Sequence, residues 1–175
     1  MRCAVLAAIV ASFALDAGSI AVAQDRAGGL AALNRLVGTW SGSGTFVDSA
    51  YSKAGSANAT TTCAWSADGQ FLICQQSAMA NGKTDDDVAI YTYDAAAAKY
   101  HFYNVGVSRA NGTELAVDPK TITYADSFRD GAKQVTTRTL NVWVTPQHYT
   151  WRAEYSLDGG ASWTLMGSGS SSRNP

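Results

Sequence analysis

The sequence predicts an all-β protein: an antiparallel, up-and-down barrel of about ten strands with a short N-terminal helix. Charged residues make up only 15% of the 175-residue chain, while glycine is frequent and proline is rare. Turn signals such as Asp68-Gly69, Asn81-Gly82 and Asp130-Gly131 recur at intervals of roughly one strand plus a tight turn. The segments between them alternate with period two and are rich in β-branched and aromatic residues, as half-buried strands are.

The helix is expected over residues 27–37, where Leu30, Leu33 and Leu36 recur at helical spacing and Gly38 follows as a stop. Residues 48–58 are expected to form a loop, and Asn111-Gly112 a turn. Consecutive hairpins of this number favour a closed barrel, because closure removes the sheet edges. Strands are expected on both sides of Asp68-Gly69 and at residues 39–47, 88–93, 100–107, 121–128, 135–144, 148–157 and 162–170.

Residues 1–23 have the pattern of a cleavable signal peptide. Arg2 gives a short positive region, residues 3–15 are apolar, and Ala21-Val22-Ala23 fits a cleavage site. The apolar run is too short for a membrane span, which needs about 20 residues. We therefore expect a single domain at 24–175, exported to the periplasm or the extracellular space and not inserted in a membrane. The net charge of −1 gives no excess of positive charge with which to bind nucleic acid.

Two cysteines remain after the predicted cleavage, Cys63 and Cys74. A two-residue turn at Asp68-Gly69 makes Ala67 face Gln70 and, counting outward, puts the cysteines opposite each other. Facing residues of a β-ladder are within disulfide reach, and exported proteins keep disulfides. A disulfide is therefore expected; the alternative, in which a bulged turn shifts the register by one residue, leaves two free thiols.

The segment 156–163 fits the Asp-box hairpin S-x-D-x-G-x-x-W. Ser156 and Asp158 are expected to bond the backbone of the turn, Gly160 to adopt positive φ, and Trp163 to pack over the hairpin. The motif occurs once, which favours a structural turn over glycan chemistry.

The candidate polar site lies on the last long hairpin. Centred on Pro146, its strands pair Arg138 with Glu154, Leu140 with Arg152, Val142 with Thr150, and Val144 with His148. One face then carries Arg138, Arg152, Glu154 and His148, and the other Trp143, Tyr149, Trp151 and Tyr155. One of these faces lines the barrel. Either a paired Arg/Glu site lies inside, or that pair is exposed and the aromatic residues, Tyr149 and Trp151 among them, face the interior.

Taken together, these features resemble the calycin superfamily. In lipocalins a G-x-W on the first strand meets an arginine near the end of the last; here the pattern gives Gly38, Trp40 and Arg173. The chain is also similar to an exported bacterial lipocalin-like family of unknown function. Its motifs match Leu36-Val37-Gly38-Thr39-Trp40, Asp68-Gly69-Gln70-Phe71, Tyr91-Thr92-Tyr93-Asp94 and the Asp box. The resemblance implies a barrel and no agreed activity.

The opening 38–44 also resembles the G-x-W-x-G-x-G of nitrobindins, which implies haem held by a histidine near the C-terminal strands. The two histidines are His101 and His148, and the last strand has none, so haem is not expected. Asp85-Asp86-Asp87 lacks the spacing of a calcium loop, so no metal site is expected and a solvated strand end is favoured.

The leading functional expectation is non-catalytic binding of a small apolar or amphipathic ligand inside the barrel. Three alternatives stay open: an enzyme using the Arg/Glu/His cluster, a haem-binding nitrobindin-like protein, and an interaction module with a filled interior.

Overall fold

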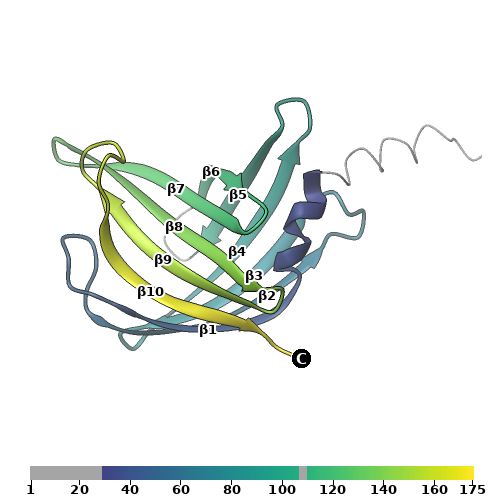
Figure 1. The fold of residues 1–175 in the computed structure, drawn as a ribbon, viewed down its shortest axis with the longest axis horizontal. Helices are drawn as coiled ribbons and strands as arrows, with labels where there is room; N and C mark the ends of the chain where they lie inside the picture. The colour runs from purple at the N-terminus through teal and green to yellow at the C-terminus, as the bar shows by residue number, and fades with distance from the viewer. Residues whose placement is uncertain (1–28, 107–109) are drawn as a thin grey trace, which may run out of the picture.

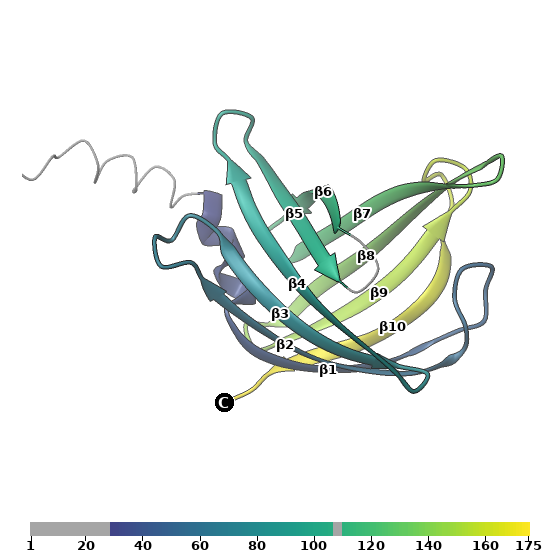
Figure 2. The same cartoon turned by 180° about the vertical axis from the view of Figure 1, so that it is seen from behind.

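The chain forms one closed barrel of ten antiparallel strands, as expected (Figures 1 and 2). This computed structural model describes residues 29–106 and 110–175, with 110–114 described by their backbone alone. Each strand pairs with its neighbours in the chain, and β1 pairs with β10. The strands are β1 Gly38–Phe46, β2 Gly55–Trp65, β3 Leu72–Ala80, β4 Lys83–Asp94, β5 Lys99–Gly106, β6 Ala110–Val117, β7 Thr121–Asp130, β8 Lys133–Thr145, β9 His148–Ser156 and β10 Thr164–Arg173.

The signal peptide predicted at 1–23 lies outside the described residues. Within the described part of the chain, no helix has the length and apolar character needed to cross a membrane.

The helix before β1 covers one end of the barrel (Figure 1). It is a 3-10 helix, η1, over Ala31–Leu36, shorter than the expected 27–37, of which 27 and 28 lie outside the described residues. Leu33 and Leu36 are buried on its inner side. Gly38, with φ of 108°, then turns the chain into β1, a conformation that side-chain-bearing residues avoid.

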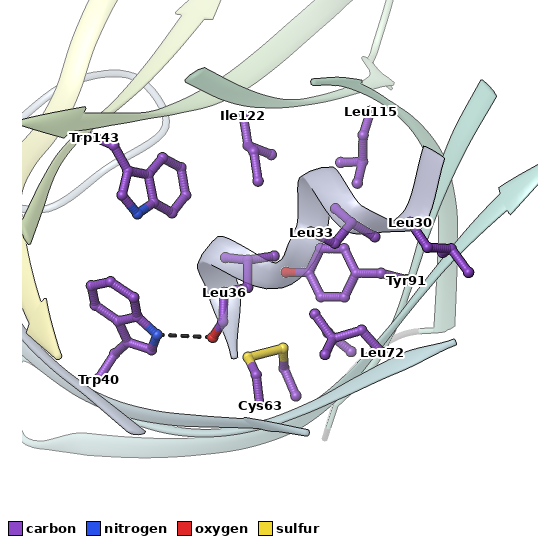
Figure 3. Close-up of a cluster of buried hydrophobic side chains, with 12 residues drawn as sticks. Leu30, Leu33, Leu36, Trp40, Cys63, Leu72, Tyr91, Leu115, Ile122 and Trp143 are labelled. Atoms are coloured by element: carbon purple, nitrogen blue, oxygen red, sulfur yellow. Dashed lines mark hydrogen bonds between the residues drawn. A yellow bond between two sulfur atoms is a disulfide. The ribbon is translucent and has the colours of Figure 1, made fainter. Parts of the chain in front are cut away.

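The core lies between this helix and the strands around it (Figure 3). Trp40 is 2% exposed, and its Nε1 donates to the Leu36 carbonyl at 2.8 Å. Its Cα partner on β10 is Arg173, whose guanidinium lies 4.8 Å from the Trp40 ring and donates to the Arg35 carbonyl. These contacts join the first strand, the last strand and the helix where the barrel closes.

The Cys63–Cys74 disulfide is confirmed. The cysteines are directly opposed on β2 and β3, with Cα atoms 4.0 Å apart. The turn is longer than expected: the Ser66 N–H donates to the Phe71 carbonyl, and residues 67–70 form the loop. Because it gains one residue on each side, the predicted register is unchanged.

Two expected connections are wrong. The loop at 48–58 ends earlier, because β2 begins at Gly55, which pairs with Phe46 and continues the ladder with β1. Asn111-Gly112 is not a turn but part of β6, opposite Asn104 and Tyr103 of β5. In both places cross-strand pairing overrides the local composition.

The hairpin of β8 and β9 keeps most of its predicted register. Arg138 faces Glu154, and the pairing continues to Trp143 and Tyr149. The expected pair of Val144 and His148 is wrong: the register shifts there, and Thr145 faces His148. A bulge of one extra residue on β8 leaves Val144 exposed.

Candidate functional site

The barrel encloses a cavity of about 650 Å³, within the size range of small-molecule sites in proteins. Its floor includes Leu36, Trp40 and the Cys63–Cys74 disulfide, at the end covered by η1. Phe46, Ala80 and Lys83 line it near the opposite ends of their strands. The cavity therefore runs along the barrel from the helix-covered end toward the opposite rim.

One wall of the cavity is made of very small residues. On the inward faces of β1, β2 and β3, cross-strand rows place glycine and alanine side by side: Gly42 pairs with Ala59, which pairs with Ala78. Ala57 and Ala80 form the next row, again lining the cavity. Because these residues occupy little of the interior, this wall leaves the space open. Sequence reasoning missed it, although two alanines two residues apart on each of β2 and β3 were a readable signal.

The adjoining part of the lining, on β9 and the end of β1, is aromatic. Tyr149 and Trp151 of β9, both predicted candidates, line the cavity. The Trp151 ring lies 5.9 Å from that of Phe46 and extends over Gly44 and Gly169, where any added Cβ would collide with it. Glycine at these two positions therefore makes room for the indole.

Deeper in the barrel, Tyr91, Phe102 and Tyr124 form a second aromatic group lining the cavity. The Tyr91 and Tyr124 hydroxyls lie 3.2 Å apart. The Phe102 ring lies 5.1 Å from the Tyr91 ring and 5.2 Å from the Tyr124 ring. Burial raises the pKa of Tyr91, Tyr124 and Tyr149 above the usual tyrosine range. These hydroxyls are therefore neutral at physiological pH.

A polar group on the inner face of β3, β4 and β5 completes the lining. Asp87 accepts from Gln76 Nε2 and from Asn104 Nδ2, each at 3.4 Å. The Asp85-Asp86-Asp87 run was expected at a solvated strand end; it lies near the start of β4, where Asp85 and Asp86 are exposed as expected and Asp87 is half-buried. Because strand residues alternate, Asp85 and Asp87 line the cavity and Asp86 points outward. The early start of β4, at Lys83, hid this from sequence reasoning.

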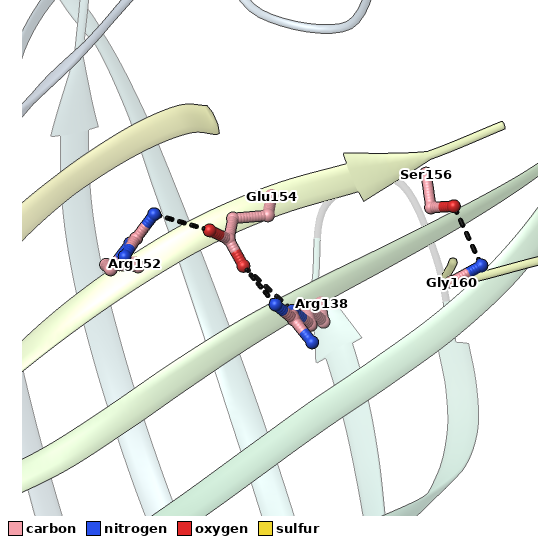
Figure 4. A network of polar contacts seen from close by, with 5 residues as sticks. All are labelled: Arg138, Arg152, Glu154, Ser156 and Gly160. Carbon is pink, nitrogen blue, oxygen red and sulfur yellow. Dashed lines mark hydrogen bonds and ion pairs between the residues drawn. The ribbon is translucent and has the colours of Figure 1, made fainter. Parts of the chain in front are cut away.

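Figure 4 shows Arg138 and Arg152 on either side of Glu154. This Arg/Glu cluster lies on the outer face, because Trp151 on the same strand faces inward and strand residues alternate. Glu154 accepts from Arg138 and Arg152, with both ion pairs at 2.7 Å. Arg138 also stacks on Trp163, 3.8 Å from its ring, and Glu154 is only 4% exposed. Neither these residues nor His148, whose ring contacts Ser172, line the cavity. The aromatic face of the hairpin is the inner one.

The Asp-box residues form a closed turn beside this cluster. Ser156 Oγ accepts from the Gly160 N–H at 2.8 Å (Figure 4). Asp158 accepts from the Ser162 N–H at 2.9 Å. Hydrogen bonds from Ser156 and Ser162 hold the pKa of Asp158 far below its usual range. A Cβ on Gly160 would press against Trp163. All these bonds are internal to the turn, which accounts for the motif structurally.

Neither histidine lines the cavity. His101 lies between the inward-facing Tyr100 and Phe102, and its ring stacks on the outward-facing Tyr103 at 6.4 Å. In the part of the chain that the structure describes, no group of three or more potential metal-ligating residues gathers.

Comparison with known proteins establishes the fold and no family. No family model matches the chain, and no curated protein matches it either. Among solved structures, Rv2717c from M. tuberculosis is similar, with a TM-score of 0.57 and 14% identity over 85% of this chain and 98% of that one. EF1p2_mFAP2b bound to DFHBI gives a TM-score of 0.43 and 12% identity over 86% of this chain and 98% of that one. The first supports the calycin-like barrel, and at this identity the likeness reaches no further than the fold.

Proposed function

We propose that this protein is an exported barrel that binds a small apolar or amphipathic ligand in its cavity without transforming it. The observation that carries the proposal is the contrast between the two cavity walls. A wall of glycine and alanine leaves space, and Trp151, Tyr149 and Phe46 face that space with large apolar surfaces. A barrel that served only as a rigid scaffold is expected to fill its interior, because empty space sacrifices packing contacts.

The position of the predicted Arg/Glu/His cluster favours binding over acid–base catalysis by that cluster. The Arg138, Arg152 and Glu154 side chains form ion pairs with one another on the outer face, away from any ligand in the cavity. The proposal includes no haem, because neither histidine faces the cavity to supply the expected axial ligand. Export is part of the proposal and is supported by the signal-peptide pattern and by the disulfide.

The test is native mass spectrometry of the mature protein purified from the periplasm of its own host. A co-purifying small molecule, released on unfolding, is the expected result and defines the chemical class of the ligand. Haemin titration with absorption spectroscopy tests the haem alternative in the same preparation. An empty protein that also binds no member of a panel of fluorescent lipids and aromatic dyes would refute the proposal.

A matched pair of variants locates the binding site. Ala78→Phe places a ring inside the cavity, while Ser77→Phe places the same ring on the outer face of the same strand, where Ser77 is exposed. We expect Ala78→Phe to abolish co-purification or dye binding and Ser77→Phe to leave it intact. Equal binding by both variants would place the ligand outside the cavity.

A further inference from the structure

The polar group in the cavity is centred on one carboxylate. Thr61 donates to Gln76 Oε1 at 3.0 Å, and Gln76 Nε2 in turn donates to Asp87 Oδ2 at 3.4 Å. Asn104 Nδ2 approaches the same oxygen from β5, again at 3.4 Å. Strands β2 to β5 thus each contribute one side chain to a fixed polar arc, and they orient Asp87 toward the cavity that it lines.

This arrangement satisfies Asp87 only in part. Both amide donors reach Oδ2 at long distances, and none of the hydrogen bonds found among the described residues reaches Oδ1. No lysine or arginine of the described residues forms an ion pair with Asp87. Partly buried carboxylates are normally matched by a cation or by several short hydrogen bonds, and Asp87 has neither.

The charges that line the cavity are unbalanced. Three lining residues are of types that carry a charge at neutral pH, namely Lys83, Asp85 and Asp87, whereas the lining tyrosines are neutral. Lys83 begins β4, four residues or about 13 Å along the strand from Asp87. Asp85 lies between them on the same face and lines the exposed part of the cavity, so two carboxylates line it against one lysine. Burial, and then the negative charges of Asp85 and Asp86, raise the pKa of Asp87.

We propose that the ligand is an amphipathic cation, whose charged nitrogen binds at Asp87 and Asp85 and whose apolar or aromatic body packs on Trp151 and Phe46. The inference rests on the function proposed above and specifies its ligand. A cationic nitrogen supplies the missing charge and donates to the open carboxylate oxygen. The aromatic wall favours the same class, because the faces of tryptophan and tyrosine attract cations.

The test uses three probes with one ring system and different head groups: 1-naphthylmethylammonium, 1-naphthylmethanol and 1-naphthoate. Isothermal titration calorimetry on the full chain is expected to show the ammonium binding at least about tenfold more tightly than the alcohol, since a charge-assisted hydrogen bond is worth at least this factor. The naphthoate is expected to bind most weakly, because it meets two carboxylates.

Two variants assign the preference to the cavity. Asp87→Asn is expected to reduce the ammonium-to-alcohol affinity ratio to about one. Asp86→Asn removes the same charge from the outer face of the same strand, and we expect it to keep the wild-type ratio. Circular dichroism verifies that each variant is folded.

The outcomes separate this inference from the function on which it rests. Equal binding of ammonium and alcohol by the wild-type protein would refute the cationic head group and leave cavity binding supported. An equal loss in Asp86→Asn and Asp87→Asn would also refute it, since the preference would then come from long-range charge. If none of the three probes binds, and the protein purified from its host is empty, the binding function itself is refuted.

Discussion

Trp40→Ala is the most direct test of how this barrel is held closed. The side chain is 2% exposed, and its ring lies 5.1 Å from Tyr149 and 6.5 Å from Trp143. Replacing a buried tryptophan by alanine typically lowers the free energy of unfolding by about 3–5 kcal/mol, through lost burial and the cavity left behind. We expect this range here, because the ring also joins β1 to the helix and to β10.

Part of this loss is polar. The indole of Trp40 donates to the Leu36 carbonyl at 2.8 Å, and the variant leaves that buried oxygen without its donor. A hydrogen bond of this kind contributes about 1 kcal/mol. Trp40→Phe keeps one aromatic ring and removes this bond together with the pyrrole half of the indole, so its cost is expected to be clearly smaller than that of Trp40→Ala. The difference between the two variants measures the packing contribution of the ring that phenylalanine retains.

Urea unfolding, followed by far-UV circular dichroism, gives the free energies. Trp151→Ala is the matched control, since it deletes the same side chain from the same barrel at a site that faces the cavity rather than the core. We expect it to cost less than half as much as Trp40→Ala. If Trp40→Ala costs less than about 1 kcal/mol, or no more than the control, the floor does not hold the barrel closed as argued.

Three further perturbations test separate parts of the structure. Reducing the Cys63–Cys74 bond is expected to lower the free energy of unfolding by about 2–4 kcal/mol, as for short closed loops, and an unchanged urea midpoint would count against this. Arg138→Ala is expected to lower the free energy of unfolding by about 1–3 kcal/mol, because it removes the contact with Trp163 and leaves the buried Glu154 carboxylate with a single partner. Arg152→Ala is expected to lower it by less than about 1 kcal/mol, because that arginine is largely exposed. Equal urea midpoints for the two variants would contradict this ranking. The pKa of Asp87 is raised in the folded protein, so its ionisation opposes folding as pH rises above the ordinary carboxyl range. Asp87→Asn is therefore expected to raise the melting temperature at pH 7, by the equivalent of less than about 1 kcal/mol, and to leave it unchanged at pH 3, where the side chain is neutral in both proteins. A gain of equal size at pH 3 would refute the charge argument.

The barrel was predictable from the sequence because its signals are local and mutually consistent. Asp68-Gly69 set the register of β2 and β3 well enough to pair the cysteines, even though the turn itself is longer. A turn extended by one residue on each side preserves the register, whereas a single inserted residue changes it. A single inserted residue is what occurs at Val144, where a bulge makes Thr145, rather than Val144, the partner of His148.

The inner face of the strands was not predictable, and the reason is physical. Along β9, residues alternate between two faces, and neither face is plainly the polar one in burial. One face carries Trp151 and the other carries Glu154, which is as buried as a core residue. Glu154 is buried on the outside because Arg138, stacked on Trp163, and Arg152 cover it. Burial therefore does not distinguish inside from outside here. Only the closure of the barrel, a long-range property, makes that distinction.

The stretch from Gly38 to Gly44 joins the fold to the cavity. Its tryptophan forms the floor and meets Arg173, while Gly42 leaves space within the lining. Gly44 lies beneath the Trp151 ring, together with Gly169 on β10, and a Cβ at Gly44 would also collide with the backbone of Ser168. The indole that is proposed to hold the ligand is thus positioned by the β1–β10 seam, and that seam is closed by the contacts of Trp40. Substitutions that loosen the closure should consequently weaken ligand binding as well as stability, whereas substitutions on the β4 wall, such as Asp87→Asn, should change ligand preference without weakening the fold.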